Sequence, residues 1–344
     1  MMRVCFASSQ AVVLTHGGVR TQMQQTKSAL EALGVRVDLL KADEQLEPSD
    51  YDVIHIFTAN IGTYHLARAL RLHGCPLVIS PIFYTRRSHA TVRAVVAADR
   101  LINRVVRGVW TDYGLMAEMC GWASAVLPNT EEEAELFVQA LGVARERVTA
   151  IPNGVEARFA DGTAELFRTD KGLEGFILCV THVGPERKNV RRLVEALEGI
   201  DHPAVIIGPV EQSPEGMKCV ERAKRNPRLT FIEALPHSSP LLASAYAACD
   251  VFVLPSLFET PGIAAMEAAL AGAKIVVTAY GGTREYFGGE AEYVNPASSG
   301  DIRRGILAAL KKPKTGGLRE RILQNFTWQR VAAQTKSVYE SILR

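Results

Sequence analysis

Two glutamates, Glu259 and Glu267, stand eight residues apart behind an apolar run, Val251–Leu254, that predicts a strand. Glu259 falls in the loop after this strand, and Glu267 falls about a turn and a half into a helix that begins near Gly262. A carboxylate accepts hydrogen bonds in pairs, which suits the vicinal hydroxyls of a ribose or a hexose. The backbone N–H groups of Gly262 and Ile263, at the start of the helix, can donate to a phosphate.

A pair of cations, Arg187 and Lys188, lies in the polar loop His182–Asn189. The loop connects a predicted strand at Phe176–Val180 to a predicted helix that starts at Val190. A positive pair at the start of a helix can hold a diphosphate. The alternative is a solvated cationic loop without a ligand.

A third candidate is the tripeptide His16-Gly17-Gly18, which follows the first apolar run, Arg3–Ala7. Glycines let the backbone approach a ligand closely, and the helix predicted over 21–33 offers its first N–H groups to an anion. The alternative is a tight turn with no further role. The dinucleotide fingerprint GxGxxG is absent here, which counts against binding of NAD or FAD.

Short apolar runs alternate with helical patterns along the chain, which predicts parallel sheets covered by helices on both faces. Further predicted strands are 35–40, 53–57, 77–79, 125–127, 148–151, 205–207, 229–232 and 274–277. A weakly patterned stretch near 156–175 separates two such sets. We therefore expect two doubly wound domains, at 1–160 and 170–325, and a last amphipathic helix within 326–344 that packs back toward the first domain. Ligands of such sheets bind beyond the carboxyl ends of the strands, so a crevice between facing domains is the expected site.

Composition narrows the class of protein. The 344 residues are 47% hydrophobic and 22% charged, with 39 Lys+Arg against 37 Asp+Glu, so disorder and a globally basic nucleic-acid binder are disfavoured. The six cysteines lie at least 30 residues apart in sequence, which predicts free thiols in a reducing compartment. The first residues do not have the pattern of a signal peptide, and no apolar run of about 18 residues could span a membrane. A cytoplasmic location is expected.

Residues 86–107 hold six arginines and a single acid, Asp99. On a helix, Arg93, Arg100, Arg104 and Arg107 share one face, and most of the valines and Ile102 share another. A basic amphipathic helix can lie on an anionic membrane or hold a lipid diphosphate. The alternative is a solvated arginine face on a packed helix.

Taken together, the motifs resemble the retaining glycosyltransferases of family 4, which have the two-domain GT-B architecture. The most specific match is the Glu259-x7-Glu267 segment. It extends to 151–154 (IPNG), 187–189 (RKN), 246–256 (YAACDVFVLPS), 281–285 (GGTRE), 326–328 (FTW) and the glycine pair at 17–18. The resemblance covers nearly the whole chain and is strongest in its second half. It implies metal-independent transfer of a hexose from a nucleoside-diphosphate sugar to a glycan or lipid-linked acceptor, in surface polysaccharide or glycolipid assembly. The chain is expected to need no cofactor and to bind no nucleic acid. A peripheral contact with a membrane is an expected partner interaction.

The resemblance also implies roles for individual residues. Glu267 matches the glutamate that binds the nucleotide ribose, and Glu259 matches the one that contacts donor-sugar hydroxyls. Lys188 matches the lysine that neutralises the leaving diphosphate. The backbone at Gly262 and Ile263 would help to hold sugar and phosphate. The loop with His16, Gly17 and Gly18 would approach the donor phosphate and the acceptor, and the base would lie near Gly208 and the segment that ends at Leu235.

Two departures from the family pattern leave alternatives open. His182 stands where the family has an arginine, so either His182 donates one bond or Arg187 takes that role. The family histidine after the fourth strand is missing from Ser80–Tyr84, and His16 is a possible substitute. A nucleotide-sugar epimerase of the same fold and a catalytically silent binding subunit remain alternatives. Asp50 and Asp52 spell the D-x-D of metal-dependent transferases, but they precede a strand, at the wrong end for a ligand.

Overall fold

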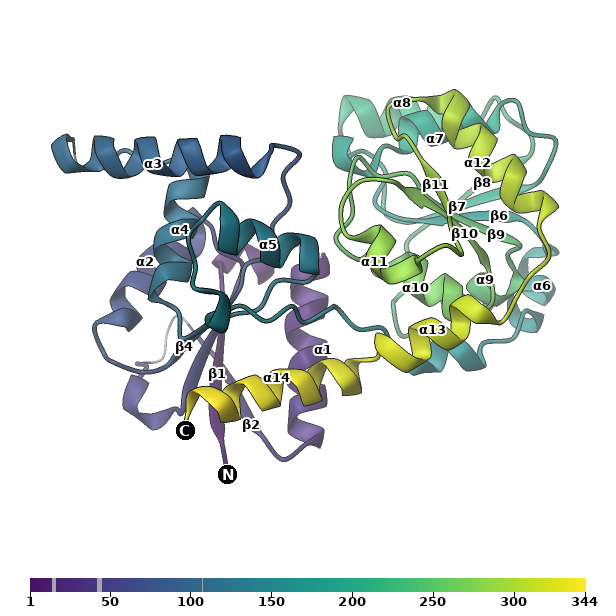
Figure 1. Cartoon of the computed structure of the whole chain (residues 1–344). Helices are drawn as coiled ribbons and strands as arrows, with labels where there is room; N and C mark the ends of the chain where they lie inside the picture. Colours follow the sequence, from purple (N-terminus) through teal and green to yellow (C-terminus); the bar gives the residue numbers. More distant parts are fainter. Residues whose placement is uncertain (14–16, 42–44, 107) are drawn as a thin grey trace. The chain divides into compact units, whose positions relative to one another are not determined.

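The structure is a computed structural model that describes residues 1–13, 17–41, 45–106 and 108–344. It contains two parallel sheets, one with strand order β2-β1-β3-β4-β5 and one with order β11-β10-β9-β6-β7-β8 (Figure 1). Helices lie on both faces of each sheet, so the predicted α/β class with two doubly wound sheets is confirmed. The chain divides into two compact units, Met1–Gly154 with Trp328–Arg344, and Val155–Thr327.

The first unit is built on the five-stranded sheet. Its strands are β1 (Arg3–Ser8), β2 (Arg36–Leu39), β3 (Val53–Phe57), β4 (Leu77–Ser80) and β5 (Ala125–Val126). Its helices are α1 (Gly18–Ala32), α2 (Ile61–Arg71), α3 (His89–Val105), α4 (Asp112–Trp122), α5 (Glu131–Gln139) and α14 (Trp328–Ile342), with short 3-10 turns at Gln10–Val13, Pro48–Asp50 and Arg145–Arg147. The strand predicted at 148–151 is wrong: only Val148 forms an isolated bridge, to Val126, because β5 is two residues long.

Helix α14 completes the core of this first unit. Trp328, Val331 and Tyr339 lie in one buried cluster with Val4 and Phe6 of β1. The Tyr339 hydroxyl lies 2.6 Å from Nδ1 of the buried His55, whose Nε2 lies 2.9 Å from the Ser80 hydroxyl. Burial lowers the pKa of His55 to about 3, so the ring is neutral in the fold.

The second unit is built on the six-stranded sheet. Its strands are β6 (Ile177–Val180), β7 (Ala204–Ile207), β8 (Leu229–Ile232), β9 (Val251–Leu254), β10 (Lys274–Thr278) and β11 (Glu292–Val294). Its helices are α6 (Glu165–Lys171), α7 (Val190–Leu197), α8 (Pro214–Ala223), α9 (Pro240–Ala248), α10 (Ile263–Leu270), α11 (Thr283–Phe287), α12 (Ser299–Lys311) and α13 (Gly317–Asn325), with 3-10 turns at Ala157–Asp161 and Glu186–Lys188. This unit begins at Val155, one residue before the weakly patterned stretch near 156–175 that separates the two sets of elements in the sequence.

The chain passes from one unit to the other twice, after Gly154 and after Thr327. On the second-unit side, the Val155 N–H donates to the Phe326 carbonyl at 2.8 Å, so the two crossing segments run side by side. On the first-unit side, Gly154 lies so close to Trp328 that an added Cβ would be 2.6 Å from its ring. A side chain at position 154 is therefore excluded by α14.

Candidate functional site

The Glu259 carboxylate is the centre of a polar cluster in the second unit. It lies in the loop between β9 and α10, its side chain is 8% exposed, and its Oε1 accepts a hydrogen bond from Lys188 Nζ at 2.7 Å. Arg187 Nη1 lies 3.4 Å from the same oxygen. The Ser256 hydroxyl donates to it at 2.7 Å. The three residues predicted to be catalytic, Glu259, Lys188 and Arg187, are thus brought together.

The charge of Glu259 follows from these neighbours. Burial by itself raises the pKa of a carboxyl group, but the cations Lys188 and Arg187 and the hydrogen bonds from Lys188 and Ser256 outweigh it, so the pKa of Glu259 lies below its ordinary value. Glu259 is therefore an ionised hydrogen-bond acceptor at neutral pH. It cannot act as a proton donor to a leaving group.

Backbone contacts hold the Glu259 loop against the loop after β10. The Glu259 N–H donates to the Tyr280 carbonyl at 3.1 Å, and the Gly282 N–H donates to the Glu259 carbonyl at 3.0 Å. Gly281, between them, has φ +94°, and a Cβ there would lie 2.0 Å from the Glu259 carbonyl oxygen. Only glycine fits, for both its conformation and its lack of a side chain.

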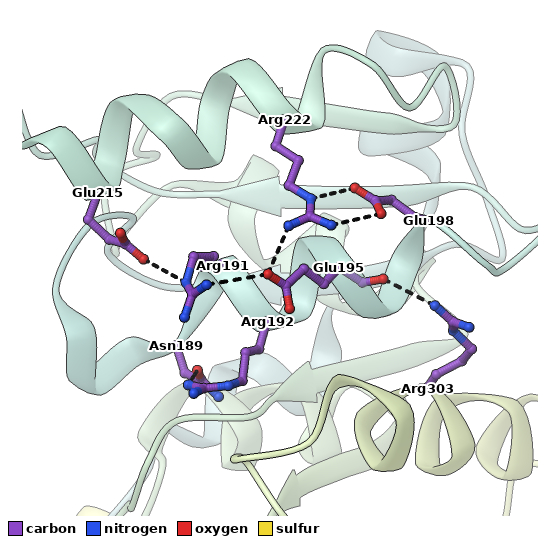
Figure 2. Close-up of polar contacts among 8 residues, drawn as sticks. All are labelled: Asn189, Arg191, Arg192, Glu195, Glu198, Glu215, Arg222 and Arg303. Atoms are coloured by element: carbon purple, nitrogen blue, oxygen red, sulfur yellow. Dashed lines mark hydrogen bonds and ion pairs between the residues drawn. The ribbon is translucent and has the colours of Figure 1, made fainter.

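Asn189 joins the loop of the two cations to the loop of Glu259. It is buried with φ +57°, and its Nδ2 donates to the carbonyls of Pro255 and Pro296, each at 2.8 Å. Its Oδ1 accepts from Arg192 Nη1 at 3.0 Å (Figure 2). Asparagine tolerates the left-handed conformation better than most residues, so position 189 combines a turn with a clamp. Asn189 belongs to the loop motif identified in the sequence, but no role was predicted for it.

The outer face of α7, which starts directly after Asn189, is fastened to its neighbours by ion pairs (Figure 2). Arg222 of α8 lies 2.8 Å from Glu195 and 2.5 Å from Glu198, and Arg191 lies 3.0 Å from Glu215. Arg303 of α12 donates to the backbone carbonyl of Glu195 at 3.2 Å. Single exposed pairs contribute little, but this network holds the helix that carries the cation loop at its start.

We expect Asn189→Gly to lower kcat/KM of the reaction that the resemblance implies by about 10-fold, because it keeps the left-handed turn but removes the hydrogen bonds that hold the loop of Lys188 against the Glu259 loop. Asn189→Ala should lose additional thermal stability, since alanine disfavours that turn. Steady-state kinetics and melting temperatures of both variants test this. Asn226→Gly, which removes an amide before β8 at the other end of the sheet, is the control. Wild-type kinetics of Asn189→Gly would show that the clamp is dispensable.

The Glu267 carboxylate, 3% exposed, forms a second cluster one and a half turns into α10. Its Oε1 lies 2.6 Å from His237 Nε2, and its Oε2 accepts from the Tyr246 hydroxyl at 2.7 Å. Desolvation and the Glu267 charge raise the pKa of Tyr246 well above its ordinary value, so the phenol remains a donor. Neither partner was predicted, because each lies more than 20 residues from Glu267 in sequence.

The remaining predicted donor residues are placed as follows. Helix α10 starts at Ile263 behind Gly262, whose φ is +76°, so the first N–H groups of the helix lie just after the Glu259 loop. Gly208 follows β7 and approaches Thr181 so closely that a Cβ would lie 1.9 Å from its carbonyl oxygen. Leu235 is half-buried against the second unit's core. His182 is exposed and, within the described part of the chain, forms no hydrogen bond or ion pair.

The first unit carries its own polar site at the strand ends. Glu133 of α5 is buried and accepts from the backbone N–H groups of Phe83, at 2.9 Å, and Asn129, at 2.7 Å. It thereby fixes the loops after β4 and β5. Ile82, in the first of these loops, has φ +52°, which is strained for a β-branched residue and is typical of functional loops. The sequence did not identify Glu133, because its partners are backbone groups.

The glycine pair of the first unit stands at the start of α1. Gly17 is the N-cap and Gly18 the first helical residue. A Cβ at either would meet nothing within 4 Å, so no neighbour in the described structure requires glycine there. The open space leaves the backbone accessible to a ligand. His16, predicted beside them, lies outside the described residues, as does Arg107.

The D-x-D segment lies away from these sites. Asp52 Oδ2 accepts from the Arg3 N–H at 2.7 Å, at the start of β1 and thus at the opposite end of the sheet from the loops described above. Among the described residues, no cluster of three or more histidines, cysteines or acids could hold a metal ion. The six cysteines are free thiols.

The basic segment forms α3, but its apolar residues do not all pack as a helical core face would. In the first half, Val92 and Val96 are buried. In the second half and the following loop, Leu101 is 63% exposed, Val105 84%, and Ile102, Val106, Val109 and Trp110 are exposed too. Arg93, Arg100 and Arg104 are exposed, while Asp99 is buried and accepts from the Thr111 N–H and hydroxyl. No helix of the described chain is both long and apolar enough to cross a bilayer.

Comparison with known proteins gives consistent matches over both units. Residues 174–312 match a family profile described as "Glycosyl transferases group 1", and residues 42–154 match one described as "Glycosyl transferase 4-like domain". A D-inositol 3-phosphate glycosyltransferase of Kribbella flavida is 28% identical over 88% of this chain and 74% of its own. A sucrose-phosphate synthase structure from Thermosynechococcus elongatus matches with TM-score 0.77 and 18% identity over 99% of both chains. Anabaena HepE, in complex with UDP and glucose, matches with TM-score 0.70 and 17% identity over 99% of this chain and 100% of its own.

Proposed function

Because the chain belongs to the group 1 (family 4) glycosyltransferases, which retain anomeric configuration and use nucleotide sugars, we propose that it transfers a hexose from a UDP-sugar to a glycan or lipid-linked acceptor. The pathway would be surface polysaccharide or glycolipid assembly. The main observation in support of this proposal is the cluster that Lys188 and Arg187 form with the buried, ionised Glu259. HepE, which was solved with UDP and glucose, supports uridine as the base.

In the proposed reaction the acceptor hydroxyl oxygen bonds to the anomeric carbon of the donor. The bond from that carbon to the diphosphate oxygen breaks, its electron pair stays with the diphosphate, and the hydroxyl proton passes to a phosphate oxygen on the same face. Lys188, with Arg187 in place of the family arginine, stabilises the departing negative charge. The ionised Glu259 accepts hydrogen bonds from the sugar hydroxyls, and Glu267 accepts them from the ribose. These cations and the N–H groups at the start of α10 replace a metal ion.

A thermal-shift titration with UDP, GDP, ADP and UDP-glucose, without added metal and with EDTA, tests the donor site. A ligand of the native state stabilises it by mass action, so UDP should raise the melting temperature in a concentration-dependent way. Glu267→Ala should weaken UDP binding by about 30-fold, because it removes a charged acceptor for the two ribose hydroxyls. A shift with GDP or ADP alone would contradict uridine, and no shift with any nucleotide would contradict the site.

We further propose that the second half of α3 contacts the membrane that carries the acceptor. Exposed apolar side chains at Leu101, Ile102 and Val105 stand beside the exposed cations Arg100 and Arg104. Anionic headgroups complement the arginines, and the apolar side chains can enter the acyl boundary. The Asp99 carboxylate is buried and accepts hydrogen bonds from the Thr111 N–H and hydroxyl, so it does not offset the exposed arginines at the surface.

The double variant Arg100→Gln/Arg104→Gln should lower binding to vesicles of anionic phospholipid by about 30-fold, because each of the two lost arginines removes about 1 kcal/mol of attraction. UDP binding should be unchanged. Vesicle co-sedimentation at low and high salt measures the effect. Val105→Ser removes an exposed apolar side chain of α3 and tests the apolar part of the contact. Leu166→Ser, which removes an exposed leucine of the second unit, is its control. Equal binding of wild type and double variant would contradict the membrane contact.

A further inference from the structure

His237 lies between two carboxylates in the second unit. It stands in the loop that connects β8 to α9, beyond the carboxyl end of the strand, and its side chain is 45% exposed. Nε2 lies 2.6 Å from Glu267 Oε1, and Nδ1 lies 3.2 Å from Glu156 Oε2. Both ring nitrogens therefore face an oxygen of an acid.

This geometry determines which protonation state fits. An ionised carboxylate only accepts hydrogen bonds, and a neutral imidazole donates through one nitrogen only. With the ring neutral, the lone pair of the other nitrogen would face a carboxylate. The imidazolium, which donates through both nitrogens, is the form that satisfies both contacts.

The groups packed around the ring favour that form. Glu267 comes from α10 and Glu156 from the segment before Ala157, while Tyr246 of α9 occupies the other oxygen of Glu267. The opposing cation is Arg158, which donates to the His237 carbonyl at 2.5 Å and to Glu156 at 3.2 Å. The hydrogen bond to Glu267, followed by the charges of both acids, outweighs burial and Arg158, so the pKa of His237 lies above 6.5.

We propose that His237, held between Glu267 and Glu156, is a positioning residue that orients Glu267 for the donor ribose and makes donor affinity depend on pH. The inference rests on the proposed role of Glu267. Each Glu267 oxygen keeps a second lone pair after His237 and Tyr246 have bonded, so the two oxygens can still accept from two ribose hydroxyls.

The sign of the pH dependence follows. While the ring carries its proton, Glu267 is held and a positive charge stands near the donor. As the pH rises through the raised pKa, one ring nitrogen loses its proton, its contact with an acid becomes repulsive, and Glu267 loses its support. Donor affinity should therefore fall on the alkaline side.

Isothermal titration calorimetry with UDP from pH 7.0 to 9.5 tests this dependence. The range lies above the second ionisation of a phosphate group, at about pH 6, so the charge of the diphosphate changes little within it. The UDP dissociation constant of the wild type should rise about 10-fold, the equivalent of one charge-assisted hydrogen bond. His237→Gln should show little rise and resemble the wild type at high pH throughout. The control is His202→Gln. His202 lies just before β7 and contacts the Gly175 carbonyl, so this variant should behave like the wild type. Matching melting temperatures would show that His237→Gln is folded.

The outcomes separate this inference from the proposed function. A pH-independent dissociation constant in the wild type, or the full rise in His237→Gln, would overturn the inference while leaving the donor site intact. No UDP binding at any pH would overturn the uridine donor site, and the inference with it. Nitrogen NMR of His237 in the free protein gives a separate readout, in which Glu267→Gln should lower the ring's pKa. An unchanged titration in Glu267→Gln would also overturn the inference.

Discussion

Lys188→Ala is expected to lower kcat/KM for sugar transfer by about 100- to 1,000-fold, the usual cost of removing a group aimed at charge that develops in the transition state. The Lys188 ammonium is fixed by Glu259 Oε1 at 2.7 Å, so its position is set before the donor arrives. Its loss also leaves Arg187 as the one remaining cation that contacts the buried Glu259 among the described residues. Both effects act on the same bond-breaking step.

Release of nucleoside diphosphate, followed at saturating and limiting donor, measures the loss. Because stabilisation of the leaving group acts in the transition state, kcat should fall more than KM rises. Lys188→Arg keeps the charge and should recover part of the rate. Lys218→Ala, which removes an exposed lysine of α8, should leave the rate unchanged. A loss confined to KM would assign Lys188 to ground-state binding alone.

Gly281→Ala is expected to destabilise the second unit by about 2–4 kcal/mol, because it forces a side chain into a left-handed position and against a backbone carbonyl. The added Cβ would lie 2.0 Å from the Glu259 carbonyl oxygen, so the Glu259 loop must move for the variant to fold. Transfer activity should fall by at least about 100-fold, since a displacement of about 1 Å costs that much.

Gly289→Ala is the matched control, because a Cβ there would meet nothing within 4 Å. Calorimetry should give a melting temperature of Gly281→Ala about 5–10 °C below that of Gly289→Ala. Activity assayed well below that temperature separates displacement of Glu259 from unfolding. Equal melting temperatures would mean that the two loops can separate at little cost.

Residues that are near in sequence, or that follow strands, could be predicted. Glu259, Gly262 and Glu267 stand on one strand-loop-helix segment, and Lys188 follows a second strand of the same sheet, so the strand-end rule brings them to one edge. The metal site at Asp50 and Asp52 was set aside by the same rule. These inferences need only local pattern and topology.

Partners set by tertiary packing could not be predicted. His237 reaches Glu267 from a loop 30 residues earlier, and Glu133 binds backbone N–H groups, which every sequence has. The apolar composition of 148–151 resembles that of a strand, but its neighbour β5 is too short to pair with it. On α3, large apolar residues occur in both halves of the helix, yet only those of the first half are buried, so the exposure of Val105 could not be read from the sequence.

Helix α14 has a consequence for the order in which the protein is made. A ribosome completes the contiguous second unit, Val155–Thr327, before it adds Trp328, Val331 and Tyr339, which close the core around β1. Domains usually fold in order of synthesis. Here the sheet of the first unit is made early, but the helix that covers Phe6 and His55 is made after the whole second unit. We therefore expect a nascent chain to complete the second unit first, and to expose its N-terminal half to chaperones and proteases in the meantime.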